Sequence, residues 1–340
     1  MSVKNEQKND RTQTRRDFLK TVTGAVASAL FLGIRCDEDS ESEPTVYGPR
    51  IGIMNPYVTG NGNPLLVCVE GTDLEIMLKK GLEAIGGLPK LLTNNQDVLI
   101  KPNFNEVSRY PWISSVECIV AIINEVKKIT AGAIKVGDMG YEFGPGNYGH
   151  LGLESAVNEA GGSCVPFSSA YPVRRNSWDS SKPDFNVYTE VYNAPVIINT
   201  PVLKRHFIAA MTCALKCNVG TISGPDATES RAYLHFESPN LFAELAEIAG
   251  LIKPELNIVD ALTIVTKDGP SINQGGVPVD VNKIVICGDM VATDAYCARI
   301  MEENDDGFQA SLIQETLATA ESLGLGTSNL ANVEIIEITA

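Results

Sequence analysis

The stretch Asp97-Val-Leu-Ile-Lys101-Pro-Asn103 shows the pattern that decides the fold class of this chain. The apolar run predicts a strand, and Pro102 ends it because proline lacks the backbone N–H that a strand interior needs. Apolar residues recur at helical spacing on each side of this strand, over 73–85 and over 115–130. Such alternation of strand and helix predicts an α/β fold.

The same alternation continues through the rest of the chain. Further strands are expected at 50–54, 133–136, 163–167, 195–199, 256–259, 283–287 and 333–338. Further helices are expected at 151–160, 208–217, 238–252, 291–302 and 309–323. Ser238 and Asp289 stand where N-caps of two of these helices belong. The predicted fold class is α/β, with a parallel or mixed sheet, or sheets, and helices on both faces.

The composition limits the kinds of partner. The 340 residues include 27 Lys and Arg against 42 Asp and Glu, a net charge of −15, and 44% are hydrophobic. A chain of this length and apolar content can bury a core without disulfides. An acidic protein repels nucleic acid and anionic lipid headgroups. We therefore expect no nucleic-acid partner, and membrane contact only through a signal segment or a lipid anchor.

The chain contains eight cysteines and three histidines, and these numbers limit the kinds of metal site to expect. No two cysteines form a C-x-x-C pair, which argues against a zinc ribbon, a thioredoxin motif and a bacterial ferredoxin cluster. Most cysteines stand among apolar neighbours and are expected to be buried free thiols. With only His150, His206 and His235, a site rich in histidine ligands is not expected.

The N-terminus predicts export. Residues 14–20, Thr-Arg-Arg-Asp-Phe-Leu-Lys, resemble the twin-arginine export signal. The next fourteen residues, 21–34, carry no charge. That run is shorter than the roughly 20 residues of a membrane span but suits the apolar region of a signal peptide. We expect residues 1–36 to be a signal peptide that the twin-arginine translocase recognises.

Cys36 and the residues after it leave two interpretations of the mature N-terminus open. Cys36 precedes an acidic stretch and resembles the acylated cysteine of a lipoprotein; the alternative is an incidental residue near an ordinary cleavage site. Residues 37–49 are expected to be an acidic tether, and 50–340 an α/β domain, with two lobes at about 50–195 and 196–340. The expected location is the periplasm, or the cell envelope through a lipid anchor.

Polar residues that follow the predicted strands form the candidate site, because ligands of α/β sheets bind beyond the carboxyl ends of the strands. Lys101, Lys204 and Lys216 stand out in an acidic chain, and ammonium groups suit a small anion, either a carboxylate or a phosphate. The alternative is that each lysine is a surface residue or pairs with an aspartate. The other candidates for substrate binding are Asn103, Asp138, Asn218 and Asp260.

Histidine supplies the candidate chemistry. His206 is the leading candidate for a general acid/base, and Lys204 joins it in the catalytic set. His235 is expected to share a two-base proton transfer with His206, or to bind the same metal. Cys213 and Cys217, four residues apart in the expected helix 208–217, extend that second possibility to a mixed thiolate–imidazole site. The simpler alternative is structural histidines and core thiols.

Four blocks of this sequence resemble signatures of the domain of unknown function 362 family. They follow one another in order over most of the chain between about residues 50 and 300. The blocks are 98–104 (VLIKPNF, like "liKPNl"), 194–206 (APVIINTPVLKRH, like "aDviInlPvlKtH"), 212–220 (TCALKCNVG, like "tgalKNlfG") and 288–295 (GDMVATDA, like "sxDpvAvDa").

The resemblance implies a fold more firmly than an activity. The family's fold is distantly similar to that of the nickel-pincer lactate racemases, and some members carry ferredoxin modules whose cysteine runs this chain lacks. Two departures stand inside the matched blocks. Pro195 replaces the usual aspartate, and Cys217 separates Lys216 from Asn218.

Three functional hypotheses follow. The first is an exported enzyme that acts on a small anionic molecule by proton transfer, or by cofactor-assisted redox or isomerisation chemistry. The second is a non-catalytic accessory protein that binds a ligand or a metal, and acylation of Cys36 would make it a lipoprotein. The third is a metal or iron–sulfur redox protein that uses Cys213 and Cys217. The cofactor is unknown, and a metal or metal–organic group is one candidate.

Overall fold

The computed structural model describes residues 45–104, 108–139, 151–175, 184–223, 234, 238 and 240–340. The residues Pro44–Ala340 form one compact unit by their internal contacts. The predicted signal segment, Cys36, His150 and His235 lie outside the described residues. None of the helices in the described ranges is long and apolar enough to cross a membrane.

A mixed sheet of ten strands forms the centre of this unit and confirms the predicted fold class. The middle of the sheet is parallel, while β12 runs antiparallel to both of its neighbours, β11 and β1. The main path of the sheet is β13 (Glu334–Thr339), β1 (Leu65–Glu70), β12 (Val277–Cys287), β11 (Leu256–Thr266), β7 (Val196–Thr200), β2 (Val98–Pro102), β3 (Ile134–Val136) and β4 (Ser163–Cys164).

Two further strands lie off this path and matter for the site. β8 (Val202–His206) follows β7 after the single residue Pro201 and pairs in parallel with the second half of β11. β9 (Ala210–Thr212) returns antiparallel to β8. The chain therefore carries Lys204 and His206 along β11, past the point where β7 ends.

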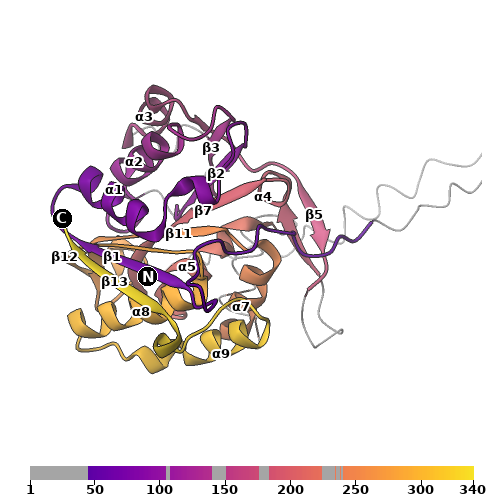
Figure 1. The fold of residues 1–340 in the computed structure, drawn as a ribbon. Coiled ribbons are helices and arrows are strands. Elements are labelled where there is room, and N and C mark those ends of the chain that lie inside the picture. Colours follow the sequence, from indigo (N-terminus) through magenta and orange to yellow (C-terminus); the bar gives the residue numbers. More distant parts are fainter. Residues whose placement is uncertain are drawn as a thin grey trace, which may run out of the picture. The chain divides into compact units, whose positions relative to one another are not determined.

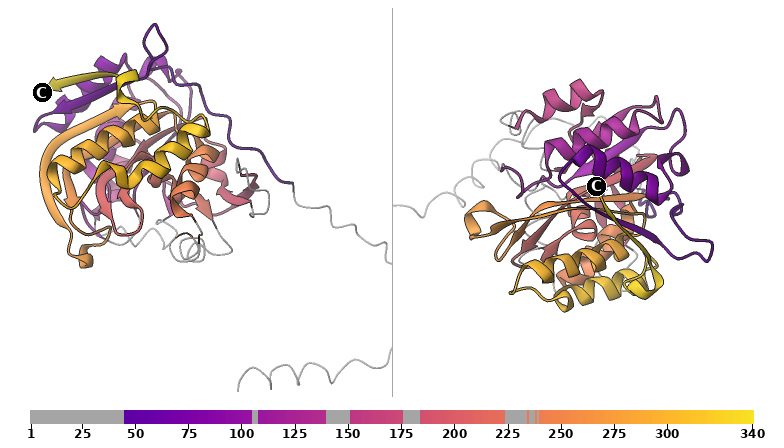
Figure 2. Two further views of the ribbon diagram at one scale, coloured as in Figure 1. Left: turned by 90° about the horizontal axis from the view of Figure 1, so that it is seen from below. Right: turned by 60° about the vertical axis from the view of Figure 1, so that its left-hand side comes forward.

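Helices cover both faces of the sheet, as Figures 1 and 2 show. One face packs against α1 (Leu74–Ile85), α2 (Val116–Val126) and α3 (Leu153–Ala160). The other packs against α5 (Ala214–Cys217), α7 (Leu241–Ile252), α8 (Met290–Asn304) and α9 (Gln314–Ser322). A small antiparallel sheet, with α4 (Thr189–Tyr192) beside it, shares a core with α7; its strands are β5 (Ala170–Val173), β6 (Phe185–Tyr188) and β10 (Ile222–Ser223).

Local sequence signals explain where the helices begin and end. Asp73 accepts a hydrogen bond from the N–H of Ile76 and caps α1, and Gly86 ends that helix at φ 106°, a conformation that glycine adopts without strain. Asp289 caps α8 as predicted, through the N–H groups of Val291 and Ala292.

Three expectations about the elements were wrong. Residues 50–54 form no strand. The N–H of Arg50 donates to the carbonyl of Leu251, and that of Ile53 donates to the side chain of Glu255, so neither bond belongs to a strand ladder. The expected helix 208–217 is helical only at α5 (Ala214–Cys217), because residues 210–212 form β9 and pair with β8. Asn240, not Ser238, caps α7 through the N–H of Ala243.

Other elements lie where no strand was expected. The sequence pattern did not predict β1, β5, β6 or β8. β1 is placed by pairing with two strands from the C-terminal third of the chain, β12 and β13. The predicted division into two lobes stays a prediction; β2 from the first half pairs in register with β7 from the second, Lys101 opposite Asn199.

Candidate functional site

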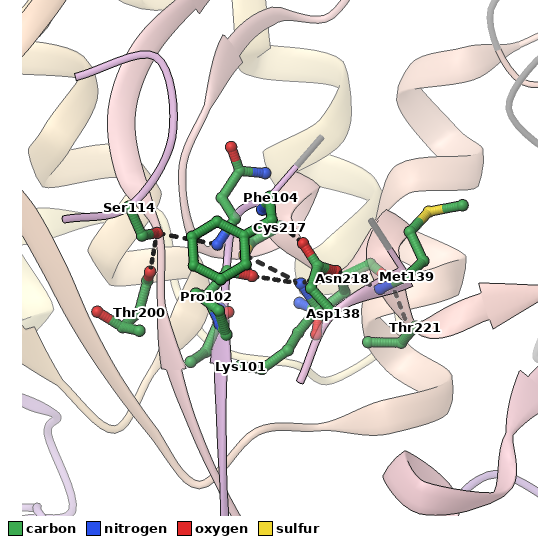
Figure 3. A network of polar contacts seen from close by, with 12 residues as sticks. Lys101, Pro102, Phe104, Ser114, Asp138, Met139, Thr200, Cys217, Asn218 and Thr221 are labelled. Atoms are coloured by element: carbon green, nitrogen blue, oxygen red, sulfur yellow. Dashed lines mark hydrogen bonds and ion pairs between the residues drawn. The ribbon is translucent and has the colours of Figure 1, made fainter. Parts of the chain in front are cut away.

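A buried ion pair stands at the carboxyl ends of β2 and β3 (Figure 3). The Nζ of Lys101, a fully buried side chain, lies 2.9 Å from the Oδ1 of Asp138. The same Nζ donates to the carbonyl of Pro102 at 2.7 Å. The Asp138 carboxylate also accepts from the N–H groups of Phe104 and Met139. Lys101 and Asp138, both predicted site residues, are thus brought together.

The turn after α5 covers this ion pair. The Sγ of Cys217 lies 3.5 Å from the Nζ of Lys101. A Cβ on Gly220 would lie 1.9 Å from Asp138 Oδ1 and 2.9 Å from Lys101 Nζ. Only a residue without a side chain lets this turn pack on the pair. Asn218 begins the same turn, so the block 212–220 and the strand-end block around Lys101 meet in space.

Three asparagines close to the ion-pair residues or to Cys217, in the chain or in the strand register, carry unpaired amide oxygens. The side chains of Asn199 and Asn218 both donate through Nδ2 to the carbonyl of Ala214, at 3.0 and 2.9 Å. Their Oδ1 atoms, and that of Asn103, are buried and have no hydrogen-bond partner among the described residues. A buried amide oxygen without a donor is costly, so these atoms suit a water molecule or a ligand that brings hydroxyl or N–H groups.

A segment that the sequence analysis did not single out, residues 108–115, crosses the strand ends. The Oγ of Ser114 accepts from the N–H of Asn103 and donates to the carbonyl of Thr200 at the end of β7. The carbonyl of Trp112 accepts from the Nζ of Lys204 on β8. The hydroxyl of Tyr110 donates to Asp260 on β11 at 2.9 Å. The position of this segment after β2 was its only signal in the sequence.

Lys204, His206 and Asp260 lie on one face of the sheet. Side chains alternate between faces along a strand. On β8 the alternate residue Leu203 packs in the core beneath α8, and on β11 Val259 and Ala261 do the same. Lys204, His206 and Asp260 therefore point to the opposite face.

Lys101 and Asn199 point the other way. Their alternate neighbours, Ile100 and Ile198, pack in the core beneath α1, α2 and α3. The structure therefore divides the predicted site residues into two groups at the same edge of the sheet. We call them the Lys101 group (Lys101, Asp138, Cys217 and Asn218) and the Lys204 group (Lys204, His206 and Asp260). Asn103 and the segment 108–115 connect the two.

The imidazole of His206 has a defined orientation. Its Nδ1 accepts from the N–H groups of Ile208 and Ala209, at 3.3 and 3.1 Å. A nitrogen that accepts from two N–H groups carries no hydrogen, so the neutral ring has its proton on Nε2. The ring also stacks on Phe207, with centroids 5.3 Å apart and an interplanar angle of 13°. In this arrangement Nε2 is the hydrogen-bond donor of the neutral ring.

Burial changes the protonation of the site carboxylates and lysines. Burial raises the pKa of Asp260 above its usual value, and the hydroxyl of Tyr110 opposes that shift. Burial alone would lower the pKa of Lys101, but the charges and hydrogen bonds of Asp138 and Cys217 together outweigh it and hold the pKa above its usual value. Lys101 is therefore a stable ammonium, and Asp260 is a carboxyl group that binds a proton more readily than an exposed aspartate.

The two predicted thiolate ligands have different surroundings. Cys217 lies beside Lys101, and burial raises its pKa to about 11. Cys213 precedes α5, where it contacts Cys297 and Asp294. Within the described ranges, no three His, Cys, Asp or Glu side chains are grouped so as to hold a metal ion. Lys216 is half-buried on α5, and His235 lies outside the described residues, so the metal site stays a prediction.

The fold and the site together define an α/β protein with buried lysines and aspartates at the carboxyl edge of its sheet. A family model described as Domain of unknown function (DUF362) matches residues 98–299. The chain belongs to this family. The matched region includes every predicted site residue of both groups.

Two known proteins are similar to this chain. The Thylakoid-associated protein sll1697 of Synechocystis sp. is 27% identical over 270 residues, which are 75% of this chain and 77% of that protein. The lactate racemase apoprotein from Thermoanaerobacterium thermosaccharolyticum has a solved structure that aligns with a TM-score of 0.43 and 12% identity. That alignment covers 71% of this chain and 57%, less than two thirds, of the racemase chain.

Proposed function

We propose that this protein is an exported enzyme that binds a small anionic molecule at the carboxyl edge of its sheet and moves a proton on it. The observation that carries the proposal is the fully buried Lys204 on β8, which shares one face of the sheet with His206 and Asp260. Ionisable groups with shifted pKa values gathered at such an edge are typical of active sites.

The Lys204 group supplies the anion site in this proposal. The Nζ of Lys204 and the Nε2–H of His206 are donors on one face of β8, two residues apart. They would hold a carboxylate or phosphate and stabilise negative charge as it forms. Because the Nδ1 of His206 is occupied, the ring does not serve as the base. Asp260, on the same face with its raised pKa, and His235 are the candidates that exchange the proton.

The Lys101 group has a positioning role in this proposal. Lys101 is neutralised by Asp138, so it holds β2, β3 and the turn at Gly220 in place. The unpaired oxygens of Asn103, Asn199 and Asn218 would accept hydrogen bonds from hydroxyl groups of the substrate. A substrate with both an anionic and a hydroxyl group therefore suits this edge best.

One observation favours the alternative, a non-catalytic binding protein. An imidazole whose Nδ1 lone pair is engaged by two backbone N–H groups is a good anion ligand and a poor base. Such a protein would bind the same anions without turnover. Export by the twin-arginine route is part of both proposals, and a lipid anchor at Cys36 belongs to the second.

Binding and turnover can be separated by experiment. The purified full chain is screened by thermal shift against small carboxylates, phosphate esters and inorganic phosphate. We expect Lys204→Met and His206→Gln to weaken binding by about 10- to 100-fold, the effect of losing one charged or short hydrogen bond. Lys135→Met, at an exposed lysine of β3, is the matched control. Circular dichroism checks that each variant is folded.

The best-bound compound is then incubated with the protein in D2O. Deuterium at a carbon of the compound, detected by NMR and lost in Asp260→Asn, supports the enzyme. Binding without exchange supports the accessory protein. Equal affinities of the wild-type protein, Lys204→Met and His206→Gln would rule out the proposed anion site.

A further inference from the structure

An extended segment with an unusual surface precedes the first strand. We call residues 45–64 the strap. Several of its large apolar side chains are exposed, and Ile51 and Met54 are 97% and 88% exposed. Six of the eleven exposed large hydrophobic residues in the described part of the chain lie within 46–58: Val46, Tyr47, Ile51, Ile53, Met54 and Val58. Exposed apolar side chains gathered in one segment usually mark a contact surface.

The strap is also free of exposed charge. Between Glu43 and Glu70 the sequence contains one ionised side chain, Arg50. In a chain that is 20% charged, a run of this length would carry about five. The guanidinium of Arg50 is buried and lies 2.9 Å from Glu255, so its charge is neutralised inside the protein. The outer surface of the strap is therefore apolar and uncharged, in a protein that is strongly acidic overall.

The strap is fixed to the body of the protein with its apolar side chains outward. Arg50 donates to the carbonyls of Ala194, Pro195, Ile252 and Lys253, and Glu255 accepts from the N–H of Ile53. These bonds anchor the strap at Arg50 and Ile53, and the side chains of Ile51 and Met54 between and beside these anchors are exposed. In Figure 2 (left) the indigo strap runs along the outside of the unit.

Three tyrosines join the strap where it begins. The ring of Tyr47 lies 4.7 Å from that of Tyr171 on β5 and 5.7 Å from that of Tyr192 on α4, measured between centroids. The hydroxyl of Tyr192 donates to the carbonyl of Gly48. Tyrosine is enriched where proteins meet the headgroup region of a bilayer, because it combines an apolar ring with a polar hydroxyl.

We propose that the strap is a membrane-contact surface that rests on the headgroup region of a lipid bilayer. Anionic headgroups repel an acidic protein, so the part that touches them must be uncharged, as the strap is. The uncharged run 21–34 ends eleven residues before the strap begins. A chain of that length spans less than about 40 Å, which keeps the strap near any membrane that holds the N-terminal segment.

This contact would leave the candidate site accessible. The carbonyls that Arg50 contacts directly precede β7 and β11, so the strap lies at the amino ends of these strands. The Lys101 and Lys204 groups lie at the carboxyl ends. The inference does not depend on the proposed function, since it concerns the opposite edge of the sheet.

The test uses the full chain and vesicles of phosphatidylcholine. Hydrogen–deuterium exchange is followed by mass spectrometry in peptides covering 45–60, which reports on the strap even when the N-terminal segment also binds. We expect vesicles to slow exchange there and not at the β11–β12 hairpin. Ile51→Glu combined with Met54→Glu should abolish the protection and weaken vesicle binding by at least about tenfold. Ile272→Glu, at an exposed apolar residue of the hairpin, is the matched control.

Two outcomes overturn the inference. Vesicle binding with unchanged exchange in the strap would assign all membrane contact to the N-terminal segment. Protection of the strap that appears without vesicles and grows with protein concentration would identify a second copy of the chain as its partner. Because the substituted side chains are exposed, the double variant should retain the thermal stability of the wild-type protein.

Discussion

At the scale of single residues, Gly220 and the pair Lys101–Asp138 depend on one another. The ion pair is buried, and the backbone of Gly220 packs directly on it. We predict that Gly220→Ala lowers the free energy of unfolding by about 1–3 kcal/mol, because the added methyl group overlaps the carboxylate of Asp138. Urea denaturation measures the change.

Gly48→Ala is the control for that prediction. Nothing lies within 4 Å of a Cβ at Gly48. This variant should match the wild-type protein within about 0.5 kcal/mol. If both variants have wild-type stability, the turn does not pack on the ion pair as described.

Asp294 provides a prediction about pH. This buried aspartate accepts from the N–H of Leu215, and burial raises its pKa from 3.8 to about 7. The folded protein therefore binds this proton more tightly than the unfolded chain does. Between pH 4 and 7 the contribution of Asp294 makes stability fall as the pH rises, by up to about 4 kcal/mol.

The variant Asp294→Asn should remove this contribution. The amide oxygen still accepts the Leu215 hydrogen bond, and the side chain no longer titrates. We expect the plot of unfolding free energy against pH to be less steep in this variant between pH 4 and 7. Asp268→Asn, at an exposed position, should leave the slope unchanged. A slope that is the same in all three proteins would contradict the pKa assigned to Asp294.

At the scale of elements, the start of α8 is tied to a distant loop. Asp289 accepts from Val291 and Ala292 at the helix N-terminus and from the N–H of Thr327, 38 residues away. We predict that Asp289→Ala lowers the free energy of unfolding by about 2 kcal/mol. Asp73→Ala, which removes the single cap bond of α1, should cost about 1 kcal/mol. Equal losses in guanidinium titrations would mean that the Thr327 bond adds no stability.

The segment 108–115 shows how an irregular element organises a site. It forms no helix or strand, yet its side chains and carbonyls reach the ends of β2, β7, β8 and β11. Hydrogen bonds to strand ends replace the regular ladder that such a segment lacks. The residues that hold Lys204 and Asp260 in place are therefore supplied from a part of the chain without any periodic pattern.

At the scale of the whole molecule, the N-terminal segment differs in charge from the acidic remainder. Residues 1–36 carry seven Lys and Arg against three Asp and Glu, and the predicted export signal contains Arg15 and Arg16. We predict that changing both to lysine abolishes export, because the twin-arginine route recognises this pair. Lys4→Arg and Lys8→Arg are the controls and should leave export intact. Cell fractionation with immunoblotting measures the result, and export of the double-lysine variant would exclude this route.

Much of the fold could be predicted from local signals. The helices at α1, α2 and α8, with caps at Asp73, Ser115 and Asp289, follow from apolar spacing and from side chains that accept the first N–H groups. The strands β2, β3 and β7 follow from short apolar runs. The first half of the expected helix 208–217 was wrong because residues 210–212 pair with β8 as β9, while its second half is the helix α5.

The candidate site was only partly predictable. Residues at strand ends such as Lys101 and Asp138 could be named because the fold class places strand ends at one edge. Their partners could not be named, since Tyr110 and Gly220 reach the site through contacts between segments far apart in the chain. Nor could the sequence show that the orientation of His206 leaves its Nδ1 occupied, because two backbone N–H groups of a turn impose it.

The sequence by itself determined the α/β class, the family, the expected export signal and the set of polar residues at the strand ends. Those features depend on periodicity and on short motifs, which are local. The tertiary structure decided that Lys101 and Lys204 lie on opposite faces of the sheet and that the strap presents its apolar side chains outward. These features depend on strand register and on buried hydrogen bonds between distant segments, and no local pattern encodes them.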